Sequence, residues 1–157
     1  MGGLLRRVML IAVALQAETS AERRELLAAH NRVRAAVDVP PLEWSSQLAR
    51  VAQQWAEKLV ASGKLRHRPE SRYGENLFAI SGARATAAGV VADWASEAKD
   101  YNAARNTCRE GTVCGHYTQI VWRGTKKVGC GVAERGRLQV WVCNYDPPGN
   151  FEGERPF

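Results

Sequence analysis

The chain has 157 residues, the size of one domain with a substantial hydrophobic core. Four cysteines are too few for a miniature fold held together by disulfides alone, and no Cys-x-x-Cys pair indicates a zinc site. The net charge of +6 arises from 22 basic and 16 acidic residues that are mixed along the chain, with no basic run interleaved with aromatic residues. Nucleic-acid binding is therefore not expected.

The first residues have the pattern of a secretion signal. Arg6 and Arg7 precede the apolar run Val8–Leu15, and Ala17 is a small residue before a polar segment. The apolar run is much shorter than the roughly 20 residues that span a bilayer. We therefore predict a signal peptide over residues 1–17, not a retained membrane anchor, and a secreted, extracellular protein. Removing its two arginines reduces the charge from +6 to about +4.

A first helix is predicted from Thr19 or Ser20 to Ala36, since residues 19–22 have the spacing of a capping box. Its apolar stripe includes a histidine: Leu26, Leu27, His30, Val33 and Val37. A lone histidine on an apolar face is usually a hydrogen-bonded core residue. We predict that His30 has a structural role and is not a ligand.

A second helix is predicted from Ser45, its cap, to Ser62, with Gly63 ending it. A strand follows at Tyr73–Ile80. A third helix is predicted over Ala83–Ala98, with Val90, Trp94 and Glu97 on one face. A carboxylate placed among apolar residues needs a partner or a solvated cleft, because burying it unpaired is costly.

Residues 99–114 are predicted to form a polar loop. Val128–Ala133 and Leu138–Tyr145 are predicted strands, joined by a hairpin turn at residues 134–137. The tail 147–157 is too rich in proline and glycine for regular structure, and it is either pinned across the surface or free. Together the elements predict one α+β domain over residues 18–157, in which helices cover a small, mainly antiparallel sheet.

Four residues at loop or helix-edge positions form a candidate site: His67, Glu75, Glu97 and His116. Two neutral imidazoles can bind zinc or copper, and a carboxylate can complete the site or act as a general base. Spacing alone is weak support, because nothing like His-Glu-x-x-His places these residues on one helix.

Several stretches resemble the motifs of one family. They are Gly115-His116-Tyr117-Thr118-Gln119-Ile120-Val121-Trp122, Gly74-Glu75-Asn76-Leu77, and Val142-Cys143-Asn144-Tyr145-Asp146-Pro147-Pro148-Gly149-Asn150-Phe151. Other matches in the same order are His30-Asn31 with Arg34, Pro40-Pro41-Leu42 with Trp44, and Trp94 with Glu97 and Tyr101. From about residue 22 onward the chain thus resembles the CAP superfamily of cysteine-rich secretory, antigen 5 and pathogenesis-related class 1 proteins, with the plant-type class 1 pattern the most similar.

The resemblance implies a three-layer α-β-α sandwich whose cleft is lined by His67, Glu75, Glu97 and His116. It also implies that His67 and His116 can hold zinc or another divalent metal; no organic cofactor is expected. Tyr117 to Trp122 is then interpreted as the packing that holds His116 in place.

The cysteine pattern differs from that of the resembling plant class, which has six. The resemblance implies pairing of Cys108 with Cys114 and of Cys130 with Cys143, and the predicted hairpin independently favours the second pair. The two missing cysteines correspond to Lys64 or Leu65 and to Arg135. We expect the absence of this third bridge to leave the loop around His67 more mobile.

Three functions follow from the resemblance. The first is a secreted defence or antimicrobial protein, expected to be monomeric, that binds a lipid, a sterol or a microbial or cell-surface target without turnover. The second is a metal-assisted peptidase with Glu75 or Glu97 as base, although two histidines are fewer than the three protein ligands usual for catalytic zinc. The third is a precursor cleaved between Asp146 and Pro147 to release residues 147–157.

Overall fold

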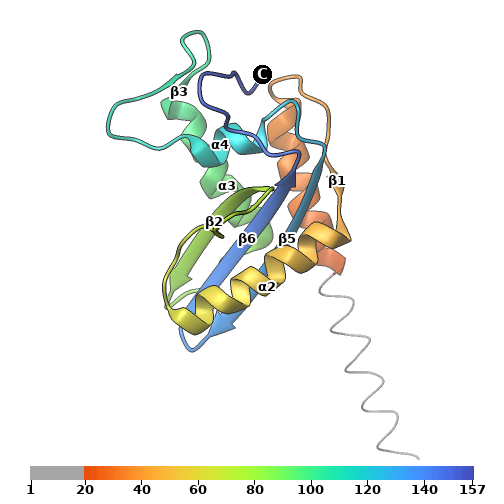
Figure 1. Cartoon of the computed structure of the whole chain (residues 1–157), viewed down its shortest axis with the longest axis vertical. Coiled ribbons are helices and arrows are strands. Elements are labelled where there is room, and N and C mark those ends of the chain that lie inside the picture. Colours follow the sequence, from red (N-terminus) through yellow and green to blue (C-terminus); the bar gives the residue numbers. More distant parts are fainter. Residues whose placement is uncertain (1–19) are drawn as a thin grey trace, which may run out of the picture.

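The computed structural model describes residues 20–157; the predicted signal peptide lies outside this range. These residues form an α+β sandwich around a four-stranded sheet of order β1-β5-β6-β2. Figure 1 shows α2 crossing one face of the sheet, while the first helix, α3 and α4 cover the other. The predicted three-layer, mainly antiparallel fold is therefore confirmed.

The first helix covers residues 20–35. The other elements of the sandwich are β1 (Glu43–Trp44), α2 (Ser46–Ser62), β2 (Gly74–Ser81), α3 (Ala87–Ala95), α4 (Gly115–Ile120), β5 (Lys127–Arg135) and β6 (Leu138–Asp146). Outside the sandwich, a 3-10 turn, η1 (Ser96–Asp100), leads into a small ladder of β3 (Tyr101–Asn102) and β4 (Thr107–Cys108).

The second helix matches its prediction. Ser45 accepts a hydrogen bond from the Leu48 N–H, and Gly63 ends the helix in the left-handed conformation at φ 65°. The helix packs very close to β5, because a Cβ on Gly129 would lie 2.3 Å from the Ala49 nitrogen. The apolar residues of this layer form one cluster: Ala52, Trp55, Ala56, Leu59, Val60, Leu77, Val140 and Val142.

The opposite face carries the larger core. The first helix contributes Leu26 and Ala29, α3 contributes the fully buried Trp94, and α4 contributes Ile120. The cross-strand disulfide Cys130–Cys143 joins β5 to β6 within this core, as predicted. Because successive residues of a strand point to opposite faces, each central strand supplies both cores.

Three predictions about local structure were wrong in their limits. The third helix begins at Ala87 and not at Ala83, because Thr86 caps it by accepting a hydrogen bond from the Gly89 N–H, and it ends in the turn η1. The polar segment 99–114 contains the ladder β3-β4. The hairpin turn has only two residues, with Gly136 at φ 60°.

β1 was not predicted. Its two residues pair in parallel with Lys127 and Val128 of β5, a contact too short to leave a periodic pattern in the sequence. In the part of the chain that is described, no helix has the length and hydrophobicity required to cross a bilayer.

The C-terminal tail is pinned to the domain. The Pro156 carbonyl of the tail accepts a hydrogen bond from the Arg123 N–H at 2.7 Å. Asn150 donates to the Gly115 carbonyl at 2.8 Å and so contacts the start of α4. Phe157 packs edge-on against Tyr101 with ring centroids 6.2 Å apart. Of the two alternatives for this segment, the structure has the pinned one.

Candidate functional site

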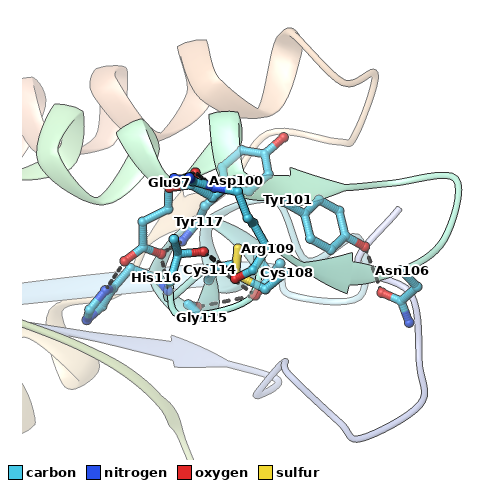
Figure 2. Close-up of a disulfide and its surroundings, with 12 residues drawn as sticks. Glu97, Asp100, Tyr101, Asn106, Cys108, Arg109, Cys114, Gly115, His116 and Tyr117 are labelled. Carbon is cyan, nitrogen blue, oxygen red and sulfur yellow. Dashed lines mark hydrogen bonds and ion pairs between the residues drawn. A yellow bond between two sulfur atoms is a disulfide. The ribbon is translucent and has the colours of Figure 1, made fainter.

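Glu97 and His116 form the first half of the site (Figure 2). Glu97 lies on η1, and its Oε1 is 2.7 Å from His116 Nδ1. Its other oxygen, Oε2, accepts from the backbone N–H groups of His116 at 2.9 Å and of Tyr117 at 3.1 Å. The partner that the sequence required for Glu97 is thus His116, whose own backbone and ring are both fixed by the same carboxylate.

His67 and Glu75 form the second half. His67 lies in the loop between α2 and β2, and its Nδ1 is 2.7 Å from Glu75 Oε1. The same oxygen accepts from the Arg68 N–H at 3.1 Å. The His67 side chain is 68% exposed whereas that of Glu75 is 5% exposed, so a buried carboxylate holds an imidazole at the surface.

The two pairs lie around the start of β2, which is an edge strand of the sheet. Glu75 points to the α2 side, as does Leu77 two residues later, while Asn76 points to the other side. There the Asn76 amide donates to the His116 carbonyl at 3.0 Å. The structure thus brings the four residues together as two pairs, not as one cluster: within residues 20–157, no three or more His, Cys, Asp or Glu side chains converge as a metal-binding group.

A chain of buried hydrogen bonds connects the His116 backbone, through Asn76, to the core of the domain. The Tyr145 hydroxyl lies 3.2 Å from the Asn76 amide nitrogen and 2.8 Å from His30 Nε2. His30 Nδ1 is 2.8 Å from the Leu26 carbonyl, which can only accept, so Nδ1 carries the proton and Nε2 accepts from Tyr145. His30 is therefore a core residue, as predicted, and its polar partners connect the first helix, β6, β2 and α4.

Burial sets the ionisation of this chain. It lowers the pKa of His30 to about 4, with the Leu26 hydrogen bond opposing and Arg34 adding to that shift. Burial also raises the pKa of Tyr145 well above its ordinary value. Both groups are consequently neutral at physiological pH, which keeps the chain of donors and acceptors intact.

Two further buried side chains, Trp94 and Arg34, contact α4 and the residues that follow it. Trp94 stacks on the His116 ring with centroids 6.1 Å apart and 18° between planes. Arg34, fully buried, donates to the carbonyls of Ile120 at 2.8 Å and Trp122 at 2.9 Å, directly after α4. A cation at the C-terminal end of a helix is favourable, since the last carbonyls lack helical partners there. As predicted, the residues after His116 form packing: Tyr117, Ile120, Val121 and Trp122 are buried.

The disulfide Cys108–Cys114 joins β4 to the residue before α4, as the resemblance implied (Figure 2). Arg109, next to Cys108, pairs with Asp100, with Arg109 Nη2 2.5 Å from Asp100 Oδ1. Since Asp100 closes the turn that carries Glu97, the bridge and this ion pair fix both approaches to the Glu97–His116 pair.

The structure also shows what stands at the positions of the third bridge. Arg135, at the end of β5, donates to the Ala61 carbonyl in the last turn of α2 at 2.8 Å. This exposed hydrogen bond takes the place of a covalent connection between the hairpin and the segment that leads to His67.

The four residues can be compared with what a metal ion requires of its ligands. In each pair the carboxylate engages Nδ1 of the histidine, which is the arrangement that orients an imidazole to coordinate through Nε2. Two imidazoles then act as ligands and two carboxylates act as orienting groups. Such a donor set would leave most ligands of a divalent ion to water, and it falls short of the three protein ligands of catalytic zinc.

Sequence reasoning missed the positioning roles of Asn76 and Tyr145. A polar residue inside the strand motif Gly74-Glu75-Asn76-Leu77 was the available signal, because a buried amide must find partners. Which partners it finds depends on segments far away in the chain.

Known proteins of similar sequence belong to one family. The family model described as cysteine-rich secretory protein family, CAP, matches residues 27–145. A pathogenesis-related protein of the PR-1 type from Sambucus nigra is 44% identical over 131 residues, covering 82% of this chain and 78% of the relative. Pathogenesis-related protein 1A from Nicotiana tabacum is 44% identical over 150 residues, covering 95% and 88%.

Among solved structures, venom allergen-like protein 4 from Schistosoma mansoni matches with a TM-score of 0.70 and 30% identity, covering 87% of this chain and 93% of that one. The fold, the motifs and the extent of the matches lead to one conclusion: the chain belongs to the CAP family of cysteine-rich secretory proteins and is similar to its plant pathogenesis-related class 1 members.

Proposed function

We propose that this chain is a secreted defence protein that acts by binding and not by turnover, with a lipid or sterol as ligand and a divalent metal held by His67 and His116. Its similarity to pathogenesis-related proteins supports the defence role. Its two disulfides are typical of proteins that fold in an oxidising compartment and support secretion. A largely apolar cavity between the first helix and α2 supports the lipid part.

The hydrogen bonds of Glu97 are the main reason to propose binding and not catalysis. Both Glu97 oxygens are engaged, one by the His116 ring and the other by two backbone N–H groups. A carboxylate saturated in this way orients a ligand and is poorly placed to take a proton from water. A divalent ion, if bound, would be held by the imidazoles of His67 and His116, whose Nδ1 atoms are engaged by Glu75 and Glu97.

Calorimetric titration with Zn²⁺ tests the metal part. We expect one saturable site in the unaltered protein and its loss in both His67→Gln and His116→Gln. Glu75→Gln and Glu97→Gln keep the nitrogen ligands and should weaken binding by about 10- to 100-fold, the usual effect of losing an orienting partner. Arg32→Gln, an exposed change on the first helix, is the control. Saturable binding that survives in both histidine variants would reject the site.

Mass spectrometry of protein recovered from culture medium, together with titration of sterols and fatty acids, tests secretion and lipid binding. A processed N-terminus near residue 17 and saturable binding of at least one lipid are expected. Retention inside the cell contradicts secretion, and no saturable binding of any lipid contradicts the lipid part.

Metal-assisted peptide hydrolysis is a second candidate, favoured by one observation. The Oε2 atom of Glu75 is buried and has no hydrogen-bond partner among the described residues, so it is the carboxylate oxygen of the site that no described group occupies. Incubation of zinc-loaded protein with a peptide library tests this candidate. Turnover that is lost in Glu75→Gln would establish it, and absence of turnover in the unaltered protein would reject it.

Release of residues 147–157 is the third candidate. The contacts of the tail with Gly115, Arg123 and Tyr101 give a structural role to the intact chain. They favour a tail that stays attached over a peptide that is cleaved off.

A further inference from the structure

The segment that leads to His67 is held by side chains and not by its own main chain. Residues 64–67 follow the end of α2 and belong to no helix, strand or turn. Within residues 20–157, none of their main-chain groups is hydrogen-bonded to another main-chain group. The position of the His67 imidazole therefore depends on the side chains that bind this segment.

Trp55, on the buried face of α2, holds the residue directly before His67. Its indole N–H donates to the Arg66 carbonyl at 3.1 Å. The Arg66 guanidinium lies over the same ring, 5.8 Å from its centroid, so the main chain and the side chain of Arg66 both contact the indole. Trp55 is 7% exposed, whereas residues 64–67 are all exposed. A side chain packed in the core thus fixes the main chain of an exposed loop.

On the other side of His67, Glu75 binds the next residue. Its Oε1 accepts from the Arg68 N–H at 3.1 Å and lies 2.7 Å from His67 Nδ1. The main chain is therefore fastened at Arg66 and at Arg68, the two neighbours of His67. Because consecutive Cα atoms are only about 3.8 Å apart, a movement of either neighbour also moves the imidazole relative to Glu75.

The other imidazole is held in a similar way. Glu97 binds the His116 ring and the His116 N–H, while the buried Asn76 amide donates to the His116 carbonyl at 3.0 Å. In each half of the site, one carboxylate binds the ring and a main-chain N–H, and a buried N–H donor binds a main-chain carbonyl. The Trp55 indole corresponds in this role to the Asn76 amide.

We propose that Trp55 is a positioning residue for His67: its indole N–H fixes the Arg66 carbonyl and thereby keeps the imidazole against Glu75 in a chain that lacks the third bridge. The inference rests on the metal part of the proposed function, because His67 is one of the two proposed ligands. Trp55 contributes no ligand and acts through the Arg66 main chain. Loss of the indole N–H should therefore affect the His67 half and leave the Glu97–His116 pair unchanged.

Hydrogen exchange of the metal-free protein, followed by NMR, tests this role. Trp55→Phe keeps an aromatic ring and removes the donor. We expect the Arg68 N–H to exchange about two- to tenfold faster, the effect of losing one hydrogen bond. Trp141→Phe is the matched control, because Trp141 is also buried but its indole N–H has no acceptor among the described residues. This control should leave the exchange of Arg68 unchanged.

Nitrogen-15 NMR of the imidazoles at one alkaline pH separates positioning from a general loss of stability. An ionised carboxylate can only accept, so the contact of Glu75 with Nδ1 favours the tautomer of His67 that carries the proton on Nδ1. In Trp55→Phe we expect a smaller fraction of this tautomer for His67 and no change for His116. Equal changes in both imidazoles, or no change in His67, would overturn the inference.

Should Trp55→Phe fail to fold, Arg66→Ala tests the same contact from the exposed side. It removes the guanidinium from the indole ring and should make exchange at Arg68 about two- to fivefold faster. Arg72→Ala is its control, because it removes a guanidinium from the Tyr73 ring in the same loop. Exchange at Arg68 that is the same in these two variants would contradict the inference.

Titration with Zn²⁺ connects the inference to the proposed function. Trp55→Phe should bind Zn²⁺ about three- to tenfold more weakly than the unaltered protein, and Trp141→Phe should bind it equally well. If the unaltered protein binds Zn²⁺ and Trp55→Phe binds it with the same affinity, the positioning role is overturned. If the unaltered protein binds no Zn²⁺, the metal part of the proposed function fails, while the exchange and imidazole measurements still decide the role of Trp55.

Discussion

The side-chain amide of Asn76 holds His116 by its main chain, donating to the His116 carbonyl at 3.0 Å, and the same nitrogen is 3.2 Å from the Tyr145 hydroxyl. One buried amide on β2 therefore connects the candidate site on α4 to the core of the sheet. Because Asn76 is 1% exposed, water cannot replace these hydrogen bonds.

Replacing Asn76 by leucine keeps the branched shape of the side chain, adds some volume and removes both donors. We expect the free energy of unfolding to fall by about 1–3 kcal/mol, since the His116 carbonyl and the Tyr145 hydroxyl each lose a buried partner. Denaturant unfolding measures the change. Asn102→Leu is the control, because Asn102 is exposed and its side chain accepts a hydrogen bond from the nearby Arg105 N–H. Equal stability of Asn76→Leu and the unaltered protein would refute this positioning role.

The stability of the protein should depend on pH through His30. Its folded pKa of about 4 lies below the unfolded value of 6.5, so the unfolded state binds the proton more readily between these values. The contribution of neutral His30 is complete above pH 6.5 and is lost as the pH falls to about 4. Its size is on the order of 3 kcal/mol, from about 1.4 kcal/mol per pKa unit.

Thermal unfolding of the unaltered protein and of His30→Gln between pH 4 and 7.5 tests this dependence. The variant should be less stable at pH 7.5, because the hydrogen bonds to Leu26 and Tyr145 change, and its stability should fall less steeply as the pH is lowered. Parallel curves for the two proteins would show that another group controls the acid sensitivity.

Removal of the tail should loosen α4. A variant that ends at Asp146 loses the hydrogen bonds of Asn150 to Gly115 and of Pro156 to Arg123. We expect faster hydrogen exchange in residues 115–125 and lower stability. Glu152→Gln, an exposed change within the tail, is the control. Unchanged exchange in the truncated protein would mean that the tail contributes nothing to the site.

Mass spectrometry of the secreted protein addresses the fate of the tail directly. Because its contacts fasten it to the domain, we expect chains that end at Phe157. Detection of a free peptide covering residues 147–157 would instead support the precursor function.

An engineered third bridge should stabilise the loop that carries His67. Arg135 already contacts the last turn of α2 through Ala61, and Leu65 is 52% exposed in the segment that follows. In Leu65→Cys/Arg135→Cys we expect an oxidised bridge and a gain of about 2–4 kcal/mol in the free energy of unfolding. Arg135→Ser isolates the loss of the Ala61 hydrogen bond and, being an exposed change, should cost under about 1 kcal/mol. Two free thiols in the folded double variant would show that these positions do not meet.

Local chemistry made much of the fold predictable. The limits of α2 are set by a capping serine and a left-handed glycine within the same segment, and the strands β2, β5 and β6 follow from short apolar segments bounded by turn residues. The third helix was misjudged because its apolar face continues past both true ends, while the cap at Thr86 and the turn η1 decide where it begins and ends.

The sequence alone determined the set of candidate residues and, through the family resemblance, the pairing of the cysteines. Only the tertiary structure decided that His67 pairs with Glu75 and His116 with Glu97, and that Asn76 and Arg34 hold α4. The reason is physical: periodicity and capping depend on near neighbours in the chain. A buried hydrogen bond such as that between His30 and Tyr145 joins residues 115 positions apart, and packing alone brings them together.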